Sequence, residues 1–379
     1  MFSCNKPNFY AGAMLLLLTA CGGGGGGGSD DNVGDNGADT GGSVTTLAAP
    51  RYAFVANTSD NSVSSYRVDS DTGLLVLAGK VAAGTSPVSV AVDPSGGYVY
   101  AVNANSNSVS QYTVSDDGTL SPMSTAEVAV GTSPYAISID PDGKYAYVAN
   151  INSNDVAQYS IGRDGSLAAM TPATVRAGVN PVAISIDPAG RHAYVANSGG
   201  GSVSQYAIGS DGSLAPMTPA TVPAGASPYA FAIAPSGQYA YVVNRSSDNV
   251  SQYSVGSDGR FSPMTPATVA AGNGPVSIAV DPTGSYAYIS NYDSDSVSQY
   301  GIGGDGGLSP MTPATVAAGS FPWSVTVDPS GRFVYVGSTY GTTVAQYGIG
   351  SGGGLTTLTP GVALAHAQPR AVAVTGRQE

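Results

Sequence analysis

Hydrophobic and polar residues alternate in short runs along most of the chain, and turn-forming residues separate these runs. In the segment 134–178, the runs Tyr135–Ile139 and Tyr145–Ala149 alternate at the two-residue period of a β-strand. Between them lies Asp140-Pro141-Asp142-Gly143, with proline second and glycine last, which is typical of a tight turn. The pattern therefore predicts two antiparallel strands joined by a short turn.

The same segment continues with two further runs. Residues 156–161 form a third strand-like run, and Asp164-Gly165 after it is a strong hairpin signal. The fourth run, 167–177, contains Pro172, which has no N–H to donate to a sheet and is expected on an edge strand. The segment therefore predicts a four-stranded antiparallel sheet whose last strand is the outermost one.

This unit recurs along the chain at a fixed interval. A proline returns in the same setting every 47 residues, and a Tyr-Val-Ala-Asn-like segment follows most of the copies. A period of this size predicts a repeat architecture, in which stacked units bury a continuous core. The prolines are Pro87, Pro134, Pro181, Pro228, Pro275, Pro322 and Pro369, and the segments end at Asn57, Asn103, Asn150, Asn197, Asn244 and Asn291, with Ser338 in the same place.

The two ends of the repeat array complement each other. After the last proline only one strand follows, at 370–374, whereas the first run, at 52–56, matches a second strand that has no first strand before it. We therefore expect an all-β, seven-bladed β-propeller over residues 49–376, with four-stranded antiparallel blades. The C-terminal strand is expected to pair with the N-terminal partial blade and close the ring of a monomeric domain, leaving residues 377–379 as a tail.

The N-terminus resembles a bacterial lipoprotein signal. An apolar stretch too short to span a bilayer ends in Leu18-Thr19-Ala20-Cys21, which resembles the lipobox. The resemblance implies that residues 1–20 are cleaved and that Cys21 carries lipid, which makes the membrane a partner. Gly22 at the next position implies the outer membrane by similarity with Gram-negative sorting. The glycine-rich, polar segment 21–48 is predicted to be a flexible tether. An ordinary signal peptide is the alternative.

Composition narrows the possible partners. The net charge of −12 argues against nucleic acid. Cys4 would leave with the signal and Cys21 would carry lipid, so no disulfide is expected. Loops such as 291–296 are rich in Asp and Asn, but each offers at most two or three carboxylates, and turns that bond their own backbone explain them. We expect no metal site and no cofactor.

Positions where the repeats differ indicate a candidate site. In a propeller the residue after each repeat proline lies at the mouth of the central channel, so four large or charged side chains are expected to converge there. Together with Phe321 in a preceding loop, Tyr135, Tyr229, Trp323 and Arg370 are the predicted ligand-binding residues for a sugar, a quinone-like ring or a peptide. The alternative is that these side chains plug the channel. The seven residues are Val88, Tyr135, Val182, Tyr229, Val276, Trp323 and Arg370.

Few residues are suited to catalysis. His192 occupies the position held by Tyr145 in another blade, and we interpret it as a packing substitution. His366 replaces the glycine seen at Gly319, near the channel mouth, and is the better candidate. The aspartates before the turn prolines, such as Asp140, are expected to accept backbone hydrogen bonds within their turns.

The segments 147–150 and 194–197, each after Asp-Pro-x-Gly, resemble the YVTN-type β-propeller repeat. They also resemble the seven-bladed family that includes 6-phosphogluconolactonase and the muconate-lactonizing enzymes. The resemblance covers residues 50–375 and implies lactone hydrolysis, with Arg370 near the developing oxyanion and His366 as the base. Relatives often have Pro-Arg-His where the first strand begins, whereas here Ala371 follows Pro369-Arg370.

Two functional hypotheses follow from these observations. The first is an envelope-anchored binding or interaction scaffold that presents the loops at the channel mouth to an envelope protein, a peptide or a glycan, on the periplasmic or the surface side. The alternative is a lactonase-like hydrolase of the 6-phosphogluconolactonase type that opens a sugar lactone. Because only Arg370 and His366 offer a cation and a base near the axis, the sequence favours the scaffold.

Overall fold

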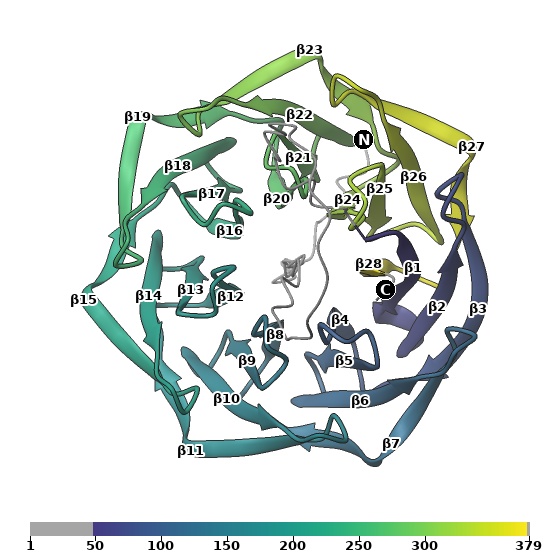
Figure 1. Cartoon of the computed structure of the whole chain (residues 1–379), viewed down its shortest axis with the longest axis vertical. Coiled ribbons are helices and arrows are strands. Elements are labelled where there is room, and N and C mark those ends of the chain that lie inside the picture. Colours follow the sequence, from purple (N-terminus) through teal and green to yellow (C-terminus); the bar gives the residue numbers. More distant parts are fainter. Residues whose placement is uncertain (1–47, 377–379) are drawn as a thin grey trace, which may run out of the picture.

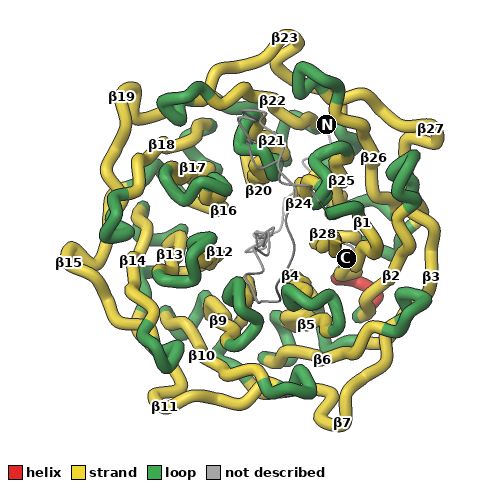
Figure 2. The backbone as a smooth tube through the Cα atoms, viewed as in Figure 1, coloured by secondary structure: helices red, strands yellow, loops and turns green. Residues whose placement is uncertain are grey.

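The computed structural model describes residues 48–376 as seven four-stranded sheets arranged around a central axis (Figure 1). The expectations for the signal, for Cys21 and for nearly all of the tether lie outside these residues. The described part contains 28 strands and one short 3-10 helix, η1 (Thr58–Asp60), drawn red in Figure 2. No helix within it is long and apolar enough to cross a bilayer. The predicted seven-bladed, all-β propeller is confirmed.

The blade formed by residues 134–176 illustrates the unit. Its strands are β8 (Pro134–Ile139), β9 (Tyr145–Asn150), β10 (Asp155–Ile161) and β11 (Leu167–Arg176), paired in that order. β8 lies next to the axis and β11 at the rim (Figure 1). The pairing of β10 with β11 shifts register between Ala157 and Tyr159. The proline-containing strand is therefore outermost, as predicted.

Five further blades repeat this order from the axis outwards. The first two comprise β4 (Pro87–Val92), β5 (Tyr98–Asn103), β6 (Ser108–Val114) and β7 (Leu120–Ala129), and then β12 (Pro181–Ile186), β13 (His192–Asn197), β14 (Ser202–Ile208) and β15 (Leu214–Pro223). The next comprises β16 (Pro228–Ile233), β17 (Tyr239–Asn244), β18 (Asn249–Val255) and β19 (Phe261–Ala270). The last two comprise β20 (Pro275–Val280), β21 (Tyr286–Asn291), β22 (Ser296–Ile302) and β23 (Leu308–Ala317), and then β24 (Pro322–Val327), β25 (Phe333–Ser338), β26 (Thr343–Ile349) and β27 (Leu355–Leu364).

The seventh blade is built from both ends of the described chain. β28 (Pro369–Gly376) pairs antiparallel with β1 (Pro50–Asn57), and Phe54 lies opposite Ala373. β2 (Ser62–Val68) and β3 (Leu75–Ala82) complete the sheet in the order β28-β1-β2-β3. Pairing of the two ends closes the ring, as the complementary ends of the repeat array predicted.

Tyrosines on the second strands join neighbouring blades. The hydroxyl of Tyr147 donates to the carbonyl of Gly212 at 2.6 Å, and the ring of Tyr145 lies against the same glycine. A Cβ on Gly212 would be 2.3 Å from that ring, and φ there is +80°, so the position requires glycine. Tyr335 bonds Gly73 in the same way across the closure. These tyrosines therefore fill the space between blades.

Glutamines on the third strands form a second inter-blade contact. The amide oxygen of Gln205 accepts from the N–H of Phe261 in the next blade at 2.8 Å, and its nitrogen donates to the carbonyl of Pro219 in its own blade at 3.1 Å. Gln346 accepts from Leu75 across the closure, so the seam repeats the bonding of the other junctions. The closing blade has Ser65 at the glutamine position, and this hydroxyl is buried without a hydrogen-bond partner.

Aspartates hold five of the six turns between first and second strands, as expected, whereas Ala234 occupies this position in the sixth turn. In the blade of β8 the Oδ1 atom of Asp140 accepts from the backbone N–H groups of Lys144 and Tyr145, both at 2.6 Å. Asp328 accepts from Arg332 and Phe333 in the same manner. These carboxylates therefore satisfy backbone donors in the turns.

Candidate functional site

Two sets of loops meet at one end of the ring, and backbone hydrogen bonds join them. In each case the residue that follows the end of a second strand bonds the residue that precedes a repeat proline. The N–H of Arg245 donates to Ser227, that of Tyr292 to Gly274 at 2.9 Å, and that of Thr339 to Phe321. Side chains from both sets of loops are thereby placed around the start of the innermost strands.

The structure brings four predicted site residues together. Tyr135 and Tyr229 share a hydrogen bond between their hydroxyls at 2.9 Å. The ring of Trp323 packs edge-on against Tyr229, with centroids 5.9 Å apart, and the Arg370 guanidinium carbon lies 4.3 Å from the centre of the Trp323 ring. We call Tyr135, Tyr229, Trp323 and Arg370 the inner layer. An arginine over a tryptophan face is a favourable cation–π arrangement.

The inner layer is almost fully buried. Trp323 is 0% exposed and Arg370 9% exposed, and both tyrosines are buried as well. Burial raises the pKa of Tyr135 and of Tyr229 well above the ordinary value, so that both hydroxyls stay neutral. The inner layer therefore packs against itself and forms a floor, as the alternative prediction of a plugged channel stated.

A second layer of residues lies over this floor, and sequence reasoning identified only Phe321 among them. Arg245 lies over two rings, with its guanidinium carbon 5.4 Å from the centre of Tyr229 and 5.2 Å from that of Tyr292. Tyr292 also packs against Trp323 at 5.3 Å and against Phe321 at 5.1 Å, and Phe321 packs against Tyr340 at 5.0 Å. We call Arg245, Tyr292, Phe321 and Tyr340 the outer layer.

The outer layer is accessible to solvent. Arg245 and Tyr292 are half-buried, whereas Phe321 is 37% and Tyr340 63% exposed. Burial, together with a hydrogen bond that the Tyr292 hydroxyl donates to Tyr340, raises the pKa of Tyr292 to about 12. A ligand would therefore meet one guanidinium and three aromatic rings, with the Tyr292 hydroxyl neutral.

A signal in the sequence would have identified two of the three missed residues. The residue after the conserved end of each second strand differs between blades, just as the residue after each repeat proline does. Arg245 and Tyr292 occupy this position, and Tyr340 follows it in the next blade. The seven residues are Thr58, Ala104, Ile151, Ser198, Arg245, Tyr292 and Thr339.

The two layers contain more hydrogen-bond donors than acceptors. Trp323 Nε1 and Arg370 Nε are buried without a hydrogen-bond partner. In the described range, 48–376, neither Arg245 nor Arg370 forms an ion pair with a carboxylate. Because unpaired buried donors are costly, the cluster is suited to a ligand rich in oxygen acceptors.

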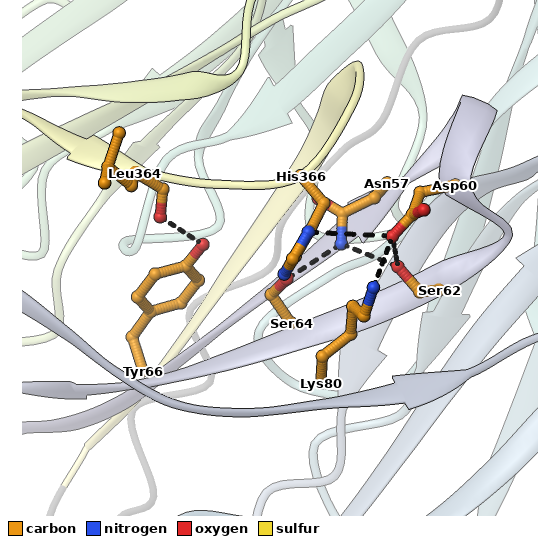
Figure 3. Close-up of polar contacts among 8 residues, drawn as sticks. All are labelled: Asn57, Asp60, Ser62, Ser64, Tyr66, Lys80, Leu364 and His366. Carbon is orange, nitrogen blue, oxygen red and sulfur yellow. Dashed lines mark hydrogen bonds and ion pairs between the residues drawn. The ribbon is translucent and has the colours of Figure 1, made fainter.

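His366 lies among residues of the closing blade (Figure 3). Its Nδ1 atom is 3.7 Å from Oδ2 of Asp60, which also accepts from Lys80 Nζ at 3.0 Å and from the Ser62 hydroxyl. The hydrogen bond from Lys80 lowers the pKa of Asp60. His366 therefore contacts Asp60, whereas Arg370 contacts Trp323, and the structure does not bring the two catalytic candidates into one pair.

His192 packs as its position in the repeat predicted. Its ring lies against Gly259 of the next blade, where an added Cβ would be 2.4 Å away, and its Nδ1 atom is 2.8 Å from Oδ2 of Asp187. It thus takes the place of Tyr145 in the neighbouring blade. Among residues 48–376 no three His, Cys, Asp or Glu side chains gather in a way that would hold a metal ion.

Comparison with known proteins gives one family match. The family model described as "Lactonase, 7-bladed beta-propeller" matches residues 51–374. No curated protein matches the chain.

Several solved structures share the fold. One is a Bacteroides fragilis protein provisionally named a 6-phosphogluconolactonase, which is 20% identical to this chain. The match covers 89% of this chain and 100% of that chain, with a TM-score of 0.76. The periplasmic gluconolactonase of Pseudomonas aeruginosa is 19% identical, with 86% and 99% covered and a TM-score of 0.73. The hydrazine synthase of Kuenenia stuttgartiensis is 22% identical, with 82% and 98% covered and a TM-score of 0.62. At these identities the likeness shows the fold alone, and one fold hosts several chemistries.

Proposed function

Because the chain belongs to the seven-bladed β-propeller lactonase family, we propose that it hydrolyses the ring ester of a sugar lactone at the two aromatic–arginine layers. The family match supports this hypothesis over the binding scaffold that the sequence alone favoured. Two of the structural relatives carry gluconolactonase names, which is in line with a sugar lactone as the substrate.

The observation that carries the proposal is the surplus of donors in the cluster. In lactone hydrolysis a water oxygen adds to the carbonyl carbon, and the electrons of the C=O double bond move onto the carbonyl oxygen. The C=O double bond then re-forms as the ring C–O bond breaks, the ring oxygen takes the proton that the water has lost, and an aldonic acid results. Negative charge develops on the former carbonyl oxygen, so a guanidinium without a carboxylate partner is suited to stabilise it.

We assign this role to Arg245, which is half-buried, with the buried Arg370 beneath adding positive charge. Both guanidiniums lie over aromatic rings. The guanidinium carbon of Arg245 is 5.2 Å from the centre of the Tyr292 ring, and that of Arg370 is 4.3 Å from the centre of the Trp323 ring. The rings hold them in place without neutralising them. His366 as the base stays a prediction, because its contact is with Asp60.

The test is lactone turnover by the full chain on a small panel of sugar lactones. We expect turnover well above the spontaneous rate, and Arg245→Ala and Arg370→Ala should each lower kcat/KM by about 100-fold, as for loss of one oxyanion donor. Arg260→Ala is the matched control, because Arg260 is exposed and paired with Asp258 in an outer turn. Turnover that is absent, or equal in all four proteins, would contradict the proposal.

We further propose that the protein acts at the cell envelope, anchored by lipid on Cys21. The motif Leu18-Thr19-Ala20-Cys21 supports this, and the Pseudomonas relative is named as periplasmic. Cys21→Ala should abolish incorporation of labelled fatty acid and release the protein from the membrane fraction. Cys4→Ala should change neither the labelling nor the fractionation. Labelling that persists in Cys21→Ala would refute the anchor.

A further inference from the structure

Three aromatic rings at the mouth have no counterpart elsewhere in the ring of blades. Tyr292, Phe321 and Tyr340 pack in sequence, with centroid distances of 5.1 and 5.0 Å, and we call them the aromatic rim. They come from loops of two adjacent blades, β20–β23 and β24–β27. At the position of Phe321 the other blades have small or polar residues, namely Ser86, Ser133, Asn180, Ser227, Gly274 and Gln368.

Phe321 adopts a backbone conformation that phenylalanine rarely takes. Its φ is +53°, in the left-handed region, where glycine, asparagine and other small polar residues are at least cost. The repeat imposes this conformation, because the Phe321 N–H donates to Asp295 Oδ1 at 2.7 Å and its carbonyl accepts from Thr339 at 3.0 Å. Ser or Gly would meet the need of the fold, so the large ring carries a cost that points to a function.

The rim is continuous with the proposed reaction site. Tyr292 packs edge-on against Trp323 of the inner layer at 5.3 Å, and the Arg245 guanidinium lies over the same tyrosine. From there the rings extend outwards to Tyr340, the most exposed of the three. A molecule with its carbonyl at Arg245 therefore has an aromatic surface beside it, long enough for a further ring.

The chemistry of the rim is suited to a sugar. It combines apolar ring surface with two tyrosine hydroxyls, and burial raises the pKa of Tyr292 to about 12, so that this hydroxyl stays neutral. The C–H face of a pyranose can pack on such rings while its hydroxyls bond the polar tips.

We propose that the aromatic rim binds a pyranose linked to the lactone ring, so that the substrates are lactones of oligosaccharide acids rather than of single sugars. This inference rests on the proposed lactonase function. The lactone carbonyl lies at Arg245, and the attached sugar lies on Phe321 and Tyr340.

The experiment compares kcat/KM of the full chain for cellobiono-1,5-lactone and for glucono-1,5-lactone. We expect the disaccharide lactone to be preferred by about tenfold, the factor that corresponds to one good aromatic contact. Phe321→Ser introduces the serine that three other blades have at this position, and in this variant the preference for the disaccharide lactone should disappear. Leu364→Ser, an exposed change on the outermost strand β27, is the control and should keep the preference.

Binding supplies a second readout that needs no turnover. Trp323 is the sole tryptophan of the chain, so its emission reports on the cluster. Cellobionate should shift this emission at lower concentration than gluconate does, and Phe321→Ser should remove the difference.

The possible outcomes separate the two proposals. Turnover with equal kcat/KM for both lactones, or a preference that survives in Phe321→Ser, would overturn the rim proposal and leave the lactonase standing. Rim-dependent binding of cellobionate without any turnover would support the sugar subsite and contradict the lactonase. If the protein shows no turnover and no binding, both proposals are overturned.

Discussion

At the scale of single residues, the candidate site arises from a few substitutions within near-identical repeats. Val182 and Val276 follow the repeat prolines of their blades, whereas the same position holds Tyr135, Tyr229 and Trp323 in other blades. Each large side chain packs against at least one other of these side chains, as in the hydroxyl pair of Tyr135 and Tyr229. The floor therefore depends on a chain of contacts between residues of different blades, from Tyr135 through Tyr229 and Trp323 to Arg370.

This pairing predicts unequal effects of two similar changes. Tyr229→Phe leaves the buried Tyr135 hydroxyl without its partner and should lower the free energy of unfolding by about 1–3 kcal/mol. Tyr135→Phe should cost less, because Tyr229 keeps its hydrogen bond with Arg245. Urea unfolding of both variants and of the double variant measures this. A double variant that is less stable than Tyr229→Phe by the full cost of Tyr135→Phe would contradict the pairing.

At the scale of elements, the blades are joined by side chains that bond backbone groups of the next blade. The third-strand glutamines occupy six of the seven blades, namely Gln111, Gln158, Gln205, Gln252, Gln299 and Gln346. Each bridges its own outermost strand and the next blade, so the glutamine position ties two sheets together.

Loss of one such bridge should weaken the whole ring. Gln205→Ala leaves the Phe261 N–H and the Pro219 carbonyl without this partner, and we expect a loss of about 2–4 kcal/mol in the free energy of unfolding. Gln238→Ala, at an exposed turn, is the matched control and should change stability by less than about 0.5 kcal/mol. Equal urea midpoints for the two variants would show that the bridges contribute little.

At the scale of the whole molecule, most of the fold could be predicted from the sequence because the same strand pattern recurs in seven copies. The period gave the number of blades, Pro172 placed the outermost strand, and the unmatched strands 52–56 and 370–374 predicted the closure. The sequence left open whether the inner layer lines an open mouth or plugs the channel, because its burial depends on how seven side chains share the space around the axis. The contact of His366 with Asp60 was also missed, since the two residues meet only through ring closure.

In the proposed reaction the guanidinium of Arg245, at the mouth of the ring, holds the lactone carbonyl. The most direct test is a crystal structure of the protein with a gluconolactam, which keeps the carbonyl and resists ring opening. We predict that the carbonyl oxygen lies within hydrogen-bond distance of Arg245 and that the lactam ring lies beside Tyr292. A ligand bound at the aspartate turns on the opposite end, or beside His366 and Asp60 with Arg245 untouched, would contradict it.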